Sequence, residues 1–197
     1  MCGLNVVGPR RRASAGTRAA LRGGGTPPRA EVASESCVDA AAGREYRPVA
    51  DFEKPTDLMH NRGLIADPEA FARERGAASW LYLCGKEFAS VEGGMSYADV
   101  ERAVPVSANV VSDPPTPLDL ELARRQIEAL DGLPRPTLVT CRTGPRSAAL
   151  IYLYAGLRAE APAEDVLACA DADDAPFVRS EELRAWITEG LAQLSSK

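Results

Sequence analysis

The run that most constrains this chain spans residues 137–147 and reads Thr-Leu-Val-Thr-Cys-Arg-Thr-Gly-Pro-Arg-Ser. An apolar, β-branched segment precedes the cysteine, and the helix-forming sequence Ala-Ala-Leu-Ile-Tyr-Leu follows the serine. The run therefore predicts a β-strand, a tight loop that opens on Cys141, and a helix. Strand–loop–helix units of this kind are typical of α/β folds.

The residue types of this loop, Cys-x-x-Gly-x-Arg-Ser, suit an oxyanion held beside a reactive sulfur. A cysteine attacks as its thiolate, which helix N-termini and guanidinium groups stabilise. A helix that begins near Pro145 directs unpaired backbone N–H groups into the loop, and such groups also bind anions. We predict that Cys141 is the nucleophile and that Arg146 holds the oxyanion with its planar guanidinium group.

The other loop residues are predicted to support anion binding. Gly144 allows a positive φ and a close approach of the backbone to the ligand. Ser147 is positioned to donate a hydrogen bond to the sulfur. The predicted anion-binding residues are therefore Arg142, Thr143, Gly144 and Ser147. The alternative is that Cys141 only packs at a strand end, as free cysteines commonly do.

This loop resembles the active-site loops of two families. One is the β-lactamase hydrolase-like phosphatase-like domain, a relative of the dual-specificity tyrosine phosphatases, and the other is the rhodanese sulfurtransferases. The segment that starts at Gly156 is similar to the tail of the phosphatase-like domain, and the Gly-Gly-x-x-x-Trp segment usual in rhodaneses does not follow the loop. The resemblance covers about residues 50–175 and implies a cysteine-phosphatase-like fold.

The length of the loop separates this chain from the tyrosine phosphatases, which carry five residues between the cysteine and the arginine. Here four residues, Arg142 to Pro145, lie between them. A shorter loop offers fewer N–H groups, and proline removes one more. Three functions stay open: a cysteine-dependent phosphatase-like hydrolase, a rhodanese-type sulfurtransferase that forms a persulfide, and an inactive module that binds an anion or a phosphoprotein. The expected substrate is a small oxyanion, a phosphoester or a persulfide.

A phosphatase also needs an acid that protonates the leaving oxygen. Asp113 follows a predicted strand, and dual-specificity phosphatases carry their acid on a loop in a similar place, so the resemblance implies this role for Asp113. The alternative is an aspartate in a proline-rich turn. Asp119 is the second candidate for the acid, although its position suits a helix N-cap better.

The charge of the chain is unevenly distributed. Residues 1–30 contain six arginines and no aspartate, glutamate or lysine, whereas the whole chain has a net charge of −5. An Arg-rich, acid-free start is typical of a transit peptide for a chloroplast or mitochondrion, and otherwise the protein is expected to be cytoplasmic. The alternative is a disordered tail or one that binds anionic surfaces. We predict a leader over 1–45 and a phosphatase-like domain over 46–197, without nucleic-acid binding.

Cysteine and histidine usage argues against a metal or cofactor site. Five cysteines form no Cys-x-x-Cys pair and there is one histidine, His60, which we expect to be structural or exposed. Cys84 ends a predicted strand, so it is a candidate either for core packing or for a disulfide with Cys141. No apolar run reaches the length of a membrane span.

Strand and helix patterns alternate along residues 67–194. Strands are predicted over 79–84, over 107–112 and around Leu138. Helices are predicted after Asp67 and Ser96, from 116 to 131, from the cysteine loop to 156, and after Pro162 and Ser180. This alternation predicts an α/β fold with a mainly parallel central sheet and helices on both faces, and ligands bind such sheets at the carboxyl ends of the strands.

Overall fold

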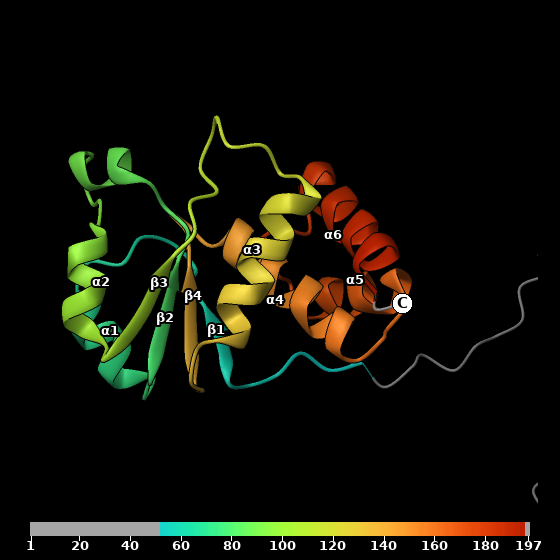
Figure 1. The fold of residues 1–197 in the computed structure, drawn as a ribbon, viewed down its shortest axis with the longest axis horizontal. Helices are drawn as coiled ribbons and strands as arrows, with labels where there is room; N and C mark the ends of the chain where they lie inside the picture. The colour runs from blue at the N-terminus through green and yellow to red at the C-terminus, as the bar shows by residue number, and fades with distance from the viewer. Residues whose placement is uncertain (1–51, 196–197) are drawn as a thin grey trace, which may run out of the picture. The chain divides into compact units, whose positions relative to one another are not determined.

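A four-stranded parallel sheet forms the centre of the protein in the computed structural model, which describes residues 52–195 (Figure 1). The strands are β1 (Leu58–His60), β2 (Ser79–Tyr82), β3 (Val106–Asn109) and β4 (Thr137–Thr140), in the spatial order β1-β4-β2-β3. The predicted parallel sheet is thus confirmed, although β2 and β3 end earlier than the sequence indicated and β1 was not predicted. The predicted leader lies outside the described residues.

Helices cover both faces of this sheet, as predicted. In Figure 1, α1 and α2 lie on one face, and α3 and α4 lie on the other, with α5 and α6 outside α4. Their bounds are α1 Pro68–Glu74, η1 Lys86–Ser90 (a 3-10 helix), α2 Tyr97–Ala103, α3 Leu120–Asp131, α4 Pro145–Arg158, α5 Ala163–Ala172 and α6 Glu181–Leu194. Between residues 52 and 195, no helix combines the length and the apolar composition that crossing a membrane requires.

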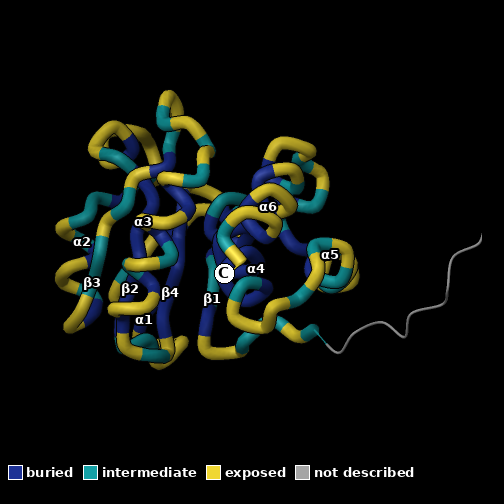
Figure 2. The backbone as a smooth tube through the Cα atoms, turned by 45° about the vertical axis from the view of Figure 1, so that its right-hand side comes forward, coloured by how far each residue is buried: buried dark blue, intermediate teal, exposed yellow. Residues whose placement is uncertain are grey.

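The hydrophobic core is centred on β4 and α4. Every residue of β2 and β4 is buried, as are ten consecutive residues of α4, Ser147 to Gly156 (Figure 2). A helix that is apolar on all sides must be covered on all sides, and here the sheet, α5 and α6 do so. The connection between β4 and α4 therefore joins a fully buried strand to a largely buried helix at the carboxyl edge of the sheet.

Side-chain caps fix where several helices begin. Asp67 accepts a hydrogen bond from the N–H of Ala70 at 2.9 Å, and Ser96 forms the predicted capping box with Asp99. Asp119 accepts from the N–H of Leu122 at 2.8 Å, so α3 begins at residue 120 and not at 116 as predicted. The reason is that the helix starts after its capping residue, which leaves 116–118 in the preceding loop.

Candidate active site

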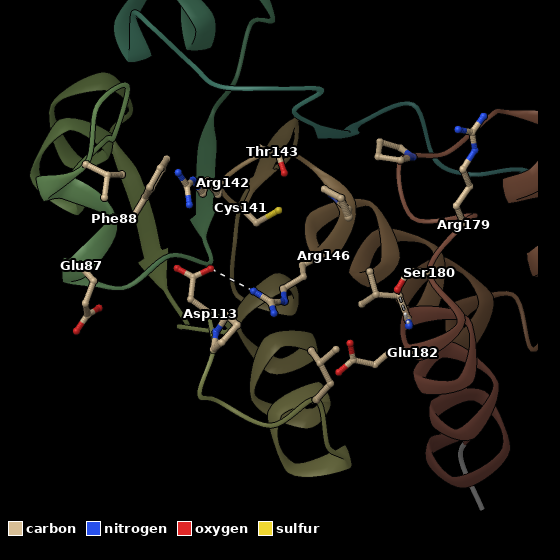
Figure 3. Close-up of a pocket in the computed structure, with 16 residues that line it drawn as sticks. Glu87, Phe88, Asp113, Cys141, Arg142, Thr143, Arg146, Arg179, Ser180 and Glu182 are labelled. Carbon is tan, nitrogen blue, oxygen red and sulfur yellow. Dashed lines mark hydrogen bonds and ion pairs between the residues drawn. The ribbon is translucent and has the colours of Figure 1, made fainter.

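Cys141 follows β4 directly and lies at the N-terminus of α4 (Figure 3). Its side chain is nearly buried, with 5% of its surface exposed. The N–H of Gly144 donates to Sγ at 3.2 Å, and the hydroxyl of Ser147 lies 3.7 Å from the same atom. The structure thus places one backbone donor against the sulfur and one hydroxyl near it. The Ser147 hydroxyl has one proton and three acceptors in reach: the carbonyl oxygen of Gly144, Oδ1 of Asn61 and Sγ.

Gly144 adopts the positive φ that the sequence predicted, +114°, and it caps α4. A Cβ built at this position would lie 2.2 Å from the backbone oxygen of Asn61, so a larger residue does not fit. Pro145 occupies the first turn of the helix, where its missing N–H costs least. The tight loop therefore depends on glycine for its turn and on proline for the start of the helix.

The predicted oxyanion donor and the predicted acid lie side by side. Nη1 of Arg146 is 3.3 Å from Oδ1 of Asp113, and the N–H of Gly85 donates to Oδ2 at 3.0 Å. About three-quarters of each of the two paired side chains is buried. The carboxylate of Asp113 thus contacts one nitrogen of the guanidinium group at the wall of the cleft (Figure 3).

A cleft of about 720 Å³ opens over Cys141. Arg142 and Thr143 are exposed along it, and the guanidinium group of Arg142 lies 5.5 Å from the centre of the Phe88 ring. Ser147 is fully buried and is not among the residues that line the cleft. Its hydroxyl lies 2.9 Å from the carbonyl oxygen of Gly144, closer than the sulfur. Other lining residues are Glu87, Pro114, Leu118, Arg179, Ser180 and Glu182.

Two further residues that the sequence analysis considered, Cys84 and His60, lie outside the cleft. Cys84 is packed in the core and forms no disulfide with Cys141, because both are free thiols. Burial raises the pKa of the Cys84 thiol, and the negative charge of Asp113 raises it further. His60 is half-buried, and burial lowers its pKa. Neither residue contacts the space above Cys141, and within residues 52–195 no three His, Cys, Asp or Glu side chains gather as a metal site.

Sequence reasoning missed two parts of the site. Asn61, which follows β1, is buried against the cysteine loop and hydrogen-bonded to it. Residues 176–183, which run from the connection after α5 into the first turn of α6, supply one wall of the cleft with Arg179, Ser180 and Glu182 (Figure 3). The serine was recognised only as the start of a helix, and no local pattern marked Asn61, because its contacts lie about 80 residues away in sequence.

Comparisons with known proteins support the fold. No family model and no curated protein sequence matches the chain. Among solved structures, a "Putative phosphatase (DUF442)" from Shewanella putrefaciens CN-32 aligns with a TM-score of 0.55 and 17% identity, covering 73% of this chain and 92% of its own. A "putative phosphatase" from Neisseria meningitidis Z2491 aligns with a TM-score of 0.53 and 17% identity, covering 71% and 96%. The chain therefore has the α/β fold of these phosphatase-like proteins, as its sequence predicted.

Proposed function

We propose that this protein is a cysteine-dependent phosphatase-type hydrolase with Cys141 as its nucleophile. One observation carries the proposal: the sulfur of Cys141 lies at the N-terminus of α4 beneath a cleft whose wall holds Arg146 and Asp113 as a pair. Nucleophile, oxyanion donor and proton donor are the three parts that phosphoester hydrolysis requires. The similar solved structures are described as phosphatases, which supports the same assignment.

In the proposed first step, the thiolate of Cys141 attacks phosphorus while Arg146 binds two phosphoryl oxygens. The bond between phosphorus and the leaving oxygen breaks, and Asp113 gives its proton to that oxygen. In the complex, the phosphoryl oxygens bind the guanidinium group of Arg146 and separate it from Asp113. The products of this step are an alcohol and a cysteinyl phosphate.

In the proposed second step, water attacks the phosphorus of the cysteinyl phosphate. The sulfur–phosphorus bond breaks, and Cys141 leaves as a thiolate that the N–H of Gly144 and the hydroxyl of Ser147 receive. Asp113 accepts the proton that the water loses, so it acts as acid in one step and as base in the next. Inorganic phosphate then departs, Asp113 releases the proton to solvent, and the carboxylate of Asp113 pairs with Arg146 again.

The short loop favours a second candidate, a sulfurtransferase. Four residues separate Cys141 from Arg146, and one of them, Pro145, has no N–H to offer to a phosphoryl group. With thiosulfate, the Cys141 thiolate would attack the outer sulfur, the sulfur–sulfur bond would break, and sulfite would leave. The resulting persulfide would pass its outer sulfur to an acceptor such as cyanide. This route needs no proton donor, so Asp113 would have no catalytic part in it.

The test compares the full chain with its Cys141→Ser variant and with Cys84→Ser as the matched control. Each protein is assayed for hydrolysis of an aryl phosphate and for transfer of sulfur from thiosulfate to cyanide. We expect phosphate hydrolysis in the parent and in Cys84→Ser, and none in Cys141→Ser. Sulfur transfer without hydrolysis would replace the first candidate with the second. Binding of phosphate without either reaction would overturn both and leave an anion-binding module.

A further inference from the structure

The side chain of Asn61 pairs with both backbone groups of Cys141. Its Oδ1 accepts from the Cys141 N–H at 3.3 Å, and its Nδ2 donates to the Cys141 carbonyl oxygen at 2.9 Å. The last paired residues of β1 and β4 are His60 and Val139, so Cys141 lies beyond the end of that ladder. The amide of Asn61 therefore takes the place of a strand partner for the nucleophile.

The same amide also holds the segments on either side of the loop. Nδ2 donates to the carbonyl oxygen of Gly63 at 2.8 Å, and Oδ1 lies 3.1 Å from the hydroxyl of Ser147. A separate backbone bond, from the N–H of Gly63 to the carbonyl oxygen of Thr143 at 2.8 Å, joins the same two segments. One buried side chain, 1% exposed, thus ties the turn after β1 to the start of the loop and to the first turn of α4.

This pairing determines which loop amides remain for a ligand. The N–H of Cys141 is committed to Asn61 and Pro145 has none, so neither residue offers an N–H to a ligand. The N–H of Gly144 donates to Sγ, and Gly144 itself packs against the backbone of Asn61. The direction of this N–H therefore depends on the contact between the loop and Asn61. A buried amide with every partner in place holds one geometry, because each broken bond would leave an unpaired polar group.

We propose that Asn61 is a positioning residue that sets the orientation of Cys141 and of the anion-binding loop. The inference rests on the proposed function of Cys141 as a nucleophile, and it holds equally for attack on phosphorus or on sulfur. It differs from a purely structural role, in which Asn61 would stabilise the fold without changing the reactivity of the thiolate. The two roles make different predictions for the chemistry of Cys141.

The experiment measures the alkylation of Cys141 by iodoacetamide in the full chain, read from the mass of the peptide that contains this residue. The rate is recorded against pH, and the protection by inorganic phosphate gives a Kd for the anion. The variants are Asn61→Ala, which removes the amide, and Asn61→Asp, which keeps its shape and the acceptor but loses both donors. Ser79→Ala is the matched control, since Ser79 is a buried residue with two side-chain hydrogen bonds, to Pro134 and Thr137. Melting temperatures are measured for all four proteins.

We expect Asn61→Ala to raise the Kd for phosphate about tenfold, the cost of losing one or two buried hydrogen bonds in the bound geometry. Asn61→Asp should in addition shift the alkylation profile to higher pH, because a carboxylate beside Cys141 disfavours the thiolate. Ser79→Ala should lower the melting temperature and leave both readouts at the parental values. If Asn61→Ala does not fold, Asn61→Ser is expected to show the same rise in Kd.

Folded Asn61 variants with the parental pH profile and the parental Kd would overturn the proposal. The assay requires no turnover, so its result is separate from that of the hydrolysis assay. A parent that binds phosphate but hydrolyses no phosphoester would leave the role of Asn61 intact and remove the proposed hydrolase. A parent whose Cys141 gains no protection from phosphate would overturn the anion site and the role of Asn61 together.

Discussion

Alanine substitutions at two glycines near the loop, Gly144 and Gly63, distinguish the effect of backbone strain from that of a steric clash. Both have positive φ, +114° and +97°. A Cβ at Gly63 would meet nothing within 4 Å, whereas one at Gly144 would lie 2.2 Å from the backbone oxygen of Asn61. We expect Gly63→Ala to lower the free energy of unfolding by about 1 kcal/mol from strain alone. Gly144→Ala should cost about 3 kcal/mol or more and slow alkylation of Cys141, because the loop must move.

Urea unfolding of the two variants gives the comparison directly, with alkylation of Cys141 as the second readout. Equal losses of stability, or a Gly144→Ala variant with parental alkylation, would show that the loop accommodates a side chain at this position. The close contact with Asn61 would then not constrain the site.

The pair of Asp113 and Arg146 leads to a second prediction at the residue scale. In Asp113→Asn, the carboxylate no longer competes with a bound anion for the guanidinium group, and the acid of the proposed mechanism is lost. We expect kcat for an aryl phosphate to fall about 100-fold or more, while the Kd for inorganic phosphate decreases. Asp171→Asn is the matched control, because Asp171 pairs with Arg184 outside the cleft. Unchanged kcat would remove Asp113 from the mechanism, and a weaker affinity for phosphate would contradict the competition.

At the scale of elements, the start of α3 depends on one side chain. Asp119 accepts from the N–H of Leu122, and its own backbone oxygen accepts from the indole of Trp186 at 3.2 Å. Asp119→Ala should lower the free energy of unfolding by about 1 kcal/mol, because it removes the cap and keeps the backbone contact. Asp119→Ser, which retains a capping oxygen, should stay near the parent in urea unfolding. If both variants lose the same free energy of unfolding, the negative charge of Asp119 and not its capping hydrogen bond stabilises α3.

Most helix starts were predictable because capping is local. Asp67, Ser96 and Ser180 each accept from a backbone N–H three residues later, so a short stretch of sequence contains the whole interaction. The start of α3 was predicted four residues too early, although Asp119 caps it in the same way. Strand β1 was not predictable in the same way. Its three residues, Leu58–His60, have too little pattern to indicate a strand, and they form one only through pairing with β4.

For the molecule as a whole, the predictable part of the candidate site is the part that one segment encodes. The loop residues from Cys141 to Ser147 lie where the strand–loop–helix pattern placed them. The resemblance singled out Asp113 as an acid, and its contact with Arg146 is a finding of the structure. Asn61 and the wall over 176–183 were missed because tertiary packing alone brings them to the loop. Sheet order determines such neighbours, and local sequence does not encode it.

His60 makes the stability of the whole fold depend on pH. It is the only histidine in the chain, and burial lowers its pKa below the usual value of 6.5. The unfolded chain therefore binds a proton at a higher pH than the folded chain does, so stability is present above pH 6.5 and is lost as the pH falls through the folded pKa. We expect the free energy of unfolding to decrease as the pH is lowered below 6.5. His60→Gln should make this dependence of the unfolding free energy on pH less steep. A slope that is the same in both proteins would assign it to other groups.

The cleft joins two walls of different origin. Cys141 and its donors belong to the buried junction of β4 and α4, whereas Arg179 and Glu182 reach the cleft from the exposed start of α6. Substitutions on the second wall alter the shape and charge that a leaving group meets, without contact with the sulfur or its hydrogen bonds. If Cys141 acts as proposed, the fold keeps the residues that face a leaving group apart from those that hold the sulfur, and we expect substitutions at Arg179 to leave the alkylation rate of Cys141 at the parental value.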